Sequence, residues 1–132
     1  MRFLYNFLTY LLLIPLATYW ISRGIGNRSY RDRLPQRFGF GFPKLQNSIW
    51  IHAVSVGEVQ AAVPLVHALM EHFPLQRIIL TTVTPTGASR VAELFGEKVV
   101  HCYMPFEFPN AIRSFFKAVK PRVAMIMETE IW

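Results

Sequence analysis

The chain opens with an unbroken run of apolar residues. Phe3–Ile21 contains no Asp, Glu, Lys, Arg or His, and its clearly polar positions are Asn6, Thr9 and Thr18. As an α-helix this run would extend roughly 28 Å at about 1.5 Å per residue, which is close to the hydrocarbon thickness of a bilayer. Tyr and Trp side chains lie towards its ends, where interfacial rings are favoured. We therefore predict that residues 1–22 form a transmembrane anchor.

Two alternatives to a retained anchor remain open. A helix lying in the plane of the membrane interface would also bury an apolar run. A cleaved signal peptide is the other alternative, although its apolar region is usually about 7–15 residues and is followed by a small-x-small cleavage site. Here the apolar run is longer, and Ile21 leads into a basic stretch instead.

Arginine is concentrated directly after the apolar run. The residues are Arg23, Arg28, Arg31, Arg33 and Arg37, opposed by Asp32 alone. By the positive-inside rule, this charge predicts that the rest of the chain lies in the cytoplasm. The same charges could attract anionic lipid head groups, but topology alone accounts for them. We predict that residues 23–48, which continue into a Gly-, Pro- and Lys-containing stretch, are a basic juxtamembrane segment and linker.

Beyond the linker, short apolar runs alternate with helical stripes. We expect strands at 49–55, 77–83, 98–103 and 122–127, and helices at 59–73, 88–95 and 109–120. Strands that alternate with helices across such short connections imply right-handed crossovers and a parallel sheet. Residues 49–132 are therefore predicted to form one α/β domain.

Composition and charge narrow the classes of function. The chain is 52% apolar and 17% charged, which excludes a disordered segment. Its net charge of +6 lies entirely in residues 1–50, so a uniformly basic nucleic-acid binder is excluded and no nucleic-acid partner is expected. The single Cys102 excludes an internal disulfide and a multi-cysteine zinc site. The histidines show no metal-ligand spacing: His52, His67, His72 and His101.

Carboxylates stand out at the predicted ends of the strands. Glu58 follows the first strand at the start of a helix, and Glu128 follows the fourth strand. Ligands gather at the carboxyl ends of parallel strands, so both residues are candidates for chemistry, although the pattern does not reveal the strand order. For Glu58 the alternative is an ordinary first-turn acid favoured by the helix dipole. No dinucleotide fingerprint, phosphate loop or nucleophile elbow is present.

Three segments together resemble a known family of glycosyltransferases. They are Trp50–Glu58 (WIHAVSVGE), Thr81–Gly87 (TTVTPTG) and Met125–Trp132 (MIMETEIW), of which the last is the most specific. The chain resembles 3-deoxy-D-manno-octulosonic acid (Kdo) transferase in these segments, in their order, and in the apolar start followed by arginines. The resemblance implies the Rossmann-like N-terminal half of a GT-B fold, in which two such domains face each other across a cleft.

The resemblance also implies the reaction and its residues. Kdo would be transferred from CMP-Kdo to a lipid A precursor at the cytoplasmic face of a bacterial inner membrane. Glu58 would be the proton acceptor, and Glu128 would stabilise the transition state. CMP-Kdo is the donor substrate, and neither a metal nor a further cofactor is expected.

Members of this family are much longer than this chain, and their C-terminal domain carries most of the CMP recognition. We therefore expect this polypeptide to be a fragment or a truncated gene product, whose activity on its own is doubtful. A catalytically inactive, membrane-tethered lipid-binding fragment is the alternative from another class of function, because an anchor and a basic segment would serve either role.

Overall fold

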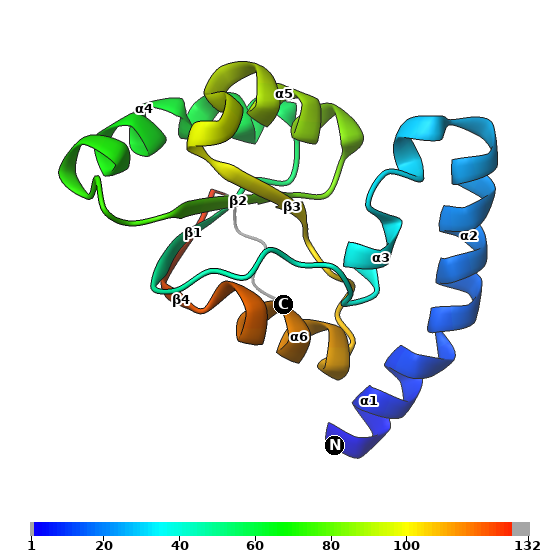
Figure 1. The fold of residues 1–132 in the computed structure, drawn as a ribbon. Helices are drawn as coiled ribbons and strands as arrows, with labels where there is room; N and C mark the ends of the chain where they lie inside the picture. Colours follow the sequence, from blue (N-terminus) through cyan, green and yellow to red (C-terminus); the bar gives the residue numbers. More distant parts are fainter. Residues whose placement is uncertain (1, 128–132) are drawn as a thin grey trace.

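A computed structural model of the protein describes residues 2–127 (Figure 1). The helices are α1 (Arg2–Leu11), α2 (Leu13–Gly26), α3 (Leu34–Arg37), α4 (Val56–His72), α5 (Pro85–Phe95) and α6 (Pro109–Val119), and the short 3-10 helices are η1 (Arg28–Tyr30) and η2 (Gly96–Lys98). The strands are β1 (Ser48–His52), β2 (Ile78–Thr82), β3 (Val100–Tyr103) and β4 (Pro121–Ile126). The predicted alternation of strands and helices is confirmed.

The strands form one parallel sheet in the order β3-β2-β1-β4. In the middle of this sheet, Ile51 of β1 lies beside Leu80 of β2 and Met125 of β4. The order matches the first part of the doubly wound 3-2-1-4-5-6 arrangement. The predicted α/β class with a parallel sheet is therefore confirmed, whereas the pairing of two such domains in a GT-B fold stays a prediction.

Alternate residues of β1 pack into two separate cores, as the pleat of a strand requires. Ile49 and Ile51 belong to a core with buried residues of α4 and α5. Trp50 belongs to the other core, with Phe115 and Val119 of α6. Figure 1 shows α4 and α5 over one face of the sheet and α6 over the other. The sheet is thus the middle of three layers. Because helices cover both of its faces, a site can form at the loops along its edges.

The apolar start of the chain folds into two consecutive helices with a break between them. Among the described residues, Phe3–Gly26 is the stretch that is long and apolar enough to cross a membrane. α1 ends at Leu11 and α2 begins at Leu13. The break follows from Pro15, because proline has no N–H to donate to the carbonyl of Leu11 four residues earlier. Insertion into a membrane stays a prediction.

Aromatic side chains join this apolar segment to the α/β domain. The ring of Trp20 lies 5.7 Å from that of Phe106, and the ring of Tyr10 lies 6.0 Å from that of Phe108, measured between centroids. Phe106 and Phe108 belong to the loop between β3 and α6. The apolar segment therefore contacts the loop after β3. Figure 1 shows α2 on the side of the domain that carries α3.

Part of the predicted segment 23–48 is packed onto the domain. Gln36 and Arg37 are buried, and the Leu45 amide donates a hydrogen bond of 2.8 Å to the carbonyl of Ala118 at the end of α6. The division of the chain into regions 1–22, 23–48 and 49–132 stays a prediction, but the middle region contributes buried side chains to the third.

Two glycines in the middle region allow a test of this packing. Gly39 and Gly41 both have left-handed backbones, with φ values of 95° and 74°. A Cβ atom on Gly39 would lie 2.6 Å from the Cα of Ala111, whereas one on Gly41 would have nothing within 4 Å. Both alanine variants carry the backbone cost, but Gly39→Ala adds a steric overlap. We expect Gly39→Ala to lose about 1–3 kcal/mol more unfolding free energy than Gly41→Ala, measured by urea denaturation in detergent; equal losses would contradict the packing.

Candidate active site

The strand order reverses at β1, and this reversal marks the place for a ligand. The chain runs outward from β1 through β2 to β3, and then returns to add β4 on the other side of β1. In open parallel sheets, ligands bind outside the carboxyl ends of the strands at such a switch point. Glu58 stands in the first turn of α4, directly after the connection from β1, and Glu128 follows β4 by two residues in the sequence. Glu128 itself lies outside the described residues.

Glu58 is held in place by hydrogen bonds at the start of α4. Its Oε2 accepts from the backbone amide of Val54, and its Oε1 accepts from the hydroxyl of Ser55 at 3.2 Å. Ser55 is the N-cap residue of α4, so Glu58 stands at the third helical position, where glutamate commonly reaches back over the helix start. The structural alternative for Glu58, an acid that stabilises the helix start, therefore matches these contacts.

The same contacts leave Glu58 able to act as a base. A carboxylate offers about four acceptor positions on its two oxygens, and the protein occupies one on each. The side chain is also partly exposed rather than enclosed. A carboxylate that is fixed in position and still has free acceptor positions can take a proton from a nearby hydroxyl. The two roles of Glu58 are thus compatible.

A buried polar triplet, which the sequence pattern did not reveal, lies at the end of β1. The Thr81 hydroxyl oxygen accepts from the indole N–H of Trp50 at 2.9 Å and lies 2.8 Å from Nδ1 of His52. The Thr81 hydroxyl thus links the Trp50 indole and the His52 ring in one buried polar cluster, which holds both rings in place.

Arg37 is a further residue whose place in the site sequence analysis missed. It is 1% exposed, its Nη2 donates to the carbonyl of Val83 at 2.5 Å, and its Nε has no hydrogen-bond partner. The guanidinium lies between two rings, with Cζ 4.0 Å from the centroid of Trp20 and 4.3 Å from that of Tyr103. Burial lowers the pKa of Arg37 to about 10, so the group remains charged at neutral pH. Nothing in the arginine-rich pattern separates it from its exposed neighbours.

A mainly apolar pocket of about 400 Å³ lies between the apolar helices and the carboxyl edge of the sheet. α2 contributes Leu16, the ends of β1 and β4 contribute His52 and Ile126, and the loop after β3 contributes Phe106. Arg37 also belongs to the lining. The pocket thus reaches the switch point from the α6 side, where Trp50 forms part of its wall.

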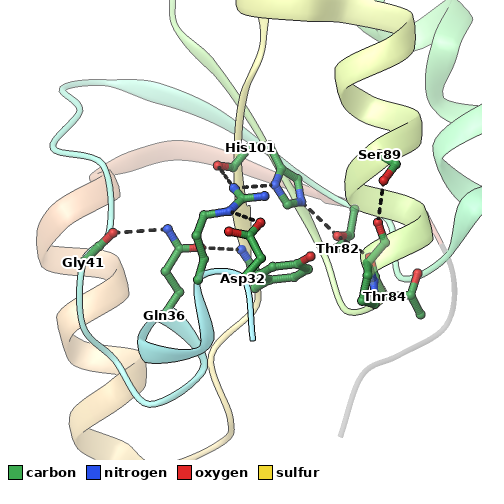
Figure 2. A network of polar contacts seen from close by, with 10 residues as sticks. Asp32, Gln36, Gly41, Thr82, Thr84, Ser89 and His101 are labelled. Atoms are coloured by element: carbon green, nitrogen blue, oxygen red, sulfur yellow. Dashed lines mark hydrogen bonds and ion pairs between the residues drawn. The ribbon is translucent and has the colours of Figure 1, made fainter. Parts of the chain in front are cut away.

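A separate polar network fixes the basic segment to β2 and β3 (Figure 2). Arg33 Nη1 donates to the carbonyl oxygen of His101 at 3.1 Å and lies 2.9 Å from its Nδ1. Because arginine can only donate, Nδ1 is the acceptor, and Nε2 donates to the Thr82 hydroxyl at 2.9 Å. Arg33 has a left-handed backbone with φ of 48°, a conformation that these contacts hold in place.

Gln36 completes this attachment from α3. Its Oε1 accepts from the backbone amide of Tyr103 at 2.9 Å, and its Nε2 donates to the carbonyl of Gly41 at 3.2 Å. The basic segment is therefore bonded to the last residues of β3, next to the loops of the switch point. Two of its five arginines, Arg33 and Arg37, serve this attachment, whereas Arg28 and Arg31 are exposed.

Metal binding and thiol chemistry find no support among the residues that the structure describes. No group of three or more His, Cys, Asp or Glu side chains could hold a metal ion among residues 2–127. Burial raises the pKa of the Cys102 thiol to about 12, which makes it a poor nucleophile at neutral pH.

Comparison with known proteins decides the family. Residues 32–132 match the family described as 3-deoxy-D-manno-octulosonic-acid transferase (kdotransferase). The chain belongs to the Kdo transferase family. It is 44% identical to a protein of Haemophilus influenzae named 3-deoxy-D-manno-octulosonic acid transferase, over 96% of this chain and 31% of the relative. A protein of the same name from Bordetella pertussis is 36% identical, over 91% of this chain and 30% of the relative.

The match corresponds to one part of a Kdo transferase. The chain spans about a third of the length of these relatives, and the matched part is N-terminal. A relative from Arabidopsis thaliana, named a probable mitochondrial 3-deoxy-D-manno-octulosonic acid transferase, shows the same proportion, with 34% identity over 98% of this chain and 29% of the relative. The resemblance inferred from the three sequence segments is thus confirmed, and the family match includes both Glu58 and the buried Arg37.

The network at His101 predicts a pH-dependent stability. Burial, followed by the charges of Arg33 and Arg37, lowers the pKa of His101 to about 3. An unfolded chain would bind a proton near pH 6.5, so acid favours unfolding, and the stability is lost as the pH falls below that value. We expect the wild type to lose about 2 kcal/mol more unfolding free energy than His101→Gln between pH 7 and pH 5.

Urea denaturation in detergent at both pH values measures this difference. His72→Gln is the matched control, because His72 is exposed on α4 and lies outside the His101 network; like the wild type, this variant should lose more stability than His101→Gln. Identical pH dependence in wild type and His101→Gln would show that His101 is not held neutral in the folded chain.

Proposed function

We propose that this chain is the acceptor-side, N-terminal part of a glycosyltransferase that transfers Kdo from CMP-Kdo to a lipid A precursor. The observation that carries the proposal is the position of Glu58. Its carboxylate is fixed by hydrogen bonds next to the switch point of the sheet, in a chain that belongs to the Kdo transferase family. A second Rossmann-like domain, completing a GT-B fold, would supply most of the site for CMP.

Glu58 acts as the base in the proposed reaction. The acceptor is a sugar hydroxyl, which becomes a good nucleophile only as its proton is removed. Glu58 takes that proton while the hydroxyl oxygen bonds to the anomeric carbon of Kdo. The bond from that carbon to the phosphate breaks, and its electron pair leaves with CMP, so the configuration is inverted. Glu128 stabilises the positive character that develops on the sugar, and no metal takes part.

The apolar segment anchors the proposed enzyme in a membrane. Phe3–Gly26 is long and apolar enough to span a bilayer, and side chains such as Phe3 and Ile14 are exposed to the surroundings. The exposed arginines Arg28 and Arg31 follow directly. These features support a protein anchored in the bacterial inner membrane with its α/β domain in the cytoplasm, where the lipid acceptor is within reach. A single-pass helix is the predicted form of the anchor. The contacts of Tyr10 and Trp20 with the loop after β3 favour the other form, a helix that lies in the plane of the membrane interface.

A membrane-tethered lipid-binding module without catalytic activity is the second candidate function. Two observations favour it: both oxygens of Glu58 are engaged in hydrogen bonds at the helix start, and an apolar pocket opens beside the apolar helices. The two candidates differ in what the loss of the Glu58 charge should do.

Substitution of Glu58 by glutamine separates the two candidates. The test uses residues 1–132 joined to the C-terminal part of the Haemophilus influenzae relative, and measures the initial rate of Kdo transfer to a lipid A precursor. Glutamine keeps the shape and an acceptor oxygen but removes the proton-accepting charge. We expect Glu58→Gln to reduce the rate by about two to four decades, with a change in stability of about 2 kcal/mol or less, and Glu128→Gln to cause a smaller but substantial loss.

Glu93→Gln is the matched control, because Glu93 is an exposed residue of α5 that pairs with Arg90; its rate should equal that of the unmodified protein. A Glu58→Gln enzyme with more than about a tenth of the unmodified rate would leave Glu58 as a helix-start acid only.

Reporter fusions test the proposed topology. A reporter that is active only in the cytoplasm should work when it is fused after Trp132, because the arginines follow the apolar run. The mature protein should retain Phe3–Ile21, as mass spectrometry of the purified chain would show. A working periplasmic reporter, or a mature chain that begins after Ile21, would overturn the proposed anchor.

A further inference from the structure

The pocket beside the apolar helices has a mainly apolar wall and a buried cation in its lining. Leu12 and Leu16 of the apolar segment lie on one side, and Met104 of the loop after β3 and Ile126 at the end of β4 lie on the other. Its volume of about 400 Å³ lies in the range of ligand pockets, about 300–1,000 Å³. Its polar lining includes a buried cation, Arg37.

The charge of Arg37 is not neutralised by the residues that the structure describes. No carboxylate among them forms an ion pair with it, and its Nε lacks any acceptor. A buried charge is costly unless an opposite charge or hydrogen bonds compensate for it. The rings of Trp20 and Tyr103 compensate in part through cation–π contacts. An anionic oxygen of a ligand, which would accept a hydrogen bond from Nε, would complete the compensation of the Arg37 charge.

The pocket lining also contains an acidic residue, Glu107, which does not pair with Arg37. Glu107 lies in the loop after β3, and its Oε2 is 3.4 Å from the hydroxyl of Tyr5 on α1. Its carboxylate thus lies at the α1 side of the pocket and forms no ion pair with Arg37 among the described residues. The apolar walls and the unneutralised cation together describe an amphiphile with a hydrocarbon chain and a negatively charged group.

We propose that this pocket binds a lipid phosphate, with a hydrocarbon chain between α2 and the carboxyl edge of the sheet and the phosphate oxygens bound by Arg37. The identity of the natural lipid as the glycosyl acceptor rests on the proposed function; the binding does not. The site would hold the acceptor by one chain and one phosphate at the carboxyl edge of the sheet, the edge at which α4 and Glu58 follow β1. The apolar segment then lies along the domain in the plane of the membrane interface, where it anchors the chain and forms one wall of a substrate site.

Fluorescence quenching of Trp50 tests the binding without any sugar transfer. Trp50 is 6% exposed and lines the pocket, so bulk lipid does not reach it. Trp20→Phe and Trp132→Phe leave it as the single tryptophan of the chain. This variant, in phosphatidylcholine nanodiscs, is titrated with 12-bromododecyl phosphate and with 12-bromododecanol. We expect the phosphate to quench Trp50 at a concentration at least tenfold lower than the alcohol requires.

Two pairs of variants distinguish the pocket from unspecific adsorption. Arg37→Gln should abolish the preference for the phosphate, whereas Arg28→Gln, which removes the same charge from an exposed position, should keep it. Leu16→Phe narrows the pocket and should weaken quenching by both probes, whereas Ile14→Phe, on the exposed side of the same helix, should not. If Arg37→Gln fails to fold, the comparison of Leu16→Phe with Ile14→Phe still tests whether the probes bind in the pocket.

Equal quenching by the phosphate and the alcohol would overturn the role of Arg37, and equal effects of Leu16→Phe and Ile14→Phe would overturn the pocket. Selective quenching in a protein whose complete form fails to transfer Kdo would retain the lipid site and refute the proposed function instead.

Discussion

The position of β1 between β2 and β4 is the constraint on which the site depends. Because every crossover between these parallel strands returns to the same edge, all the loops after the strands lie together at the carboxyl ends. The reversal of strand order at β1 then places the start of α4, which carries Glu58, after the strand that lies beside β4. Both faces of β1 are buried, so neither its register nor the start of α4 can shift without disrupting two cores.

The sequence was sufficient to predict the part of the fold that repeats. Apolar runs and helical stripes located β1–β3 and α4–α6 because each of these elements buries side chains at regular positions. β4 was located by its apolar sequence, although most of its residues are exposed in the structure. The strand order and the break before Leu13 required the structure, since pairing depends on contacts between distant residues. Glu58 was found from its place after a strand, and the family match covers it.

The buried polar residues of the site could not have been predicted in the same way. Arg37 lies in a run of arginines of which most are exposed, and the pattern there indicates charge only. Its burial depends on Trp20, Tyr103 and Val83, which come from three separate parts of the chain. The same holds for His101, whose partners Arg33 and Thr82 are distant in sequence. These contacts join the apolar segment, the basic segment and the sheet edge into one site.

Photo-crosslinking of the acceptor tests the location of this site most directly. A benzophenone amino acid is placed at Val56, two residues before Glu58, or at Leu75, which is 94% exposed in the loop that leads into β2 at the opposite edge of the sheet. Each protein is completed with the C-terminal part of the Haemophilus influenzae relative and irradiated with labelled lipid A precursor. The account predicts labelling at Val56 and none above background at Leu75; equal labelling, or labelling at Leu75 alone, would contradict it.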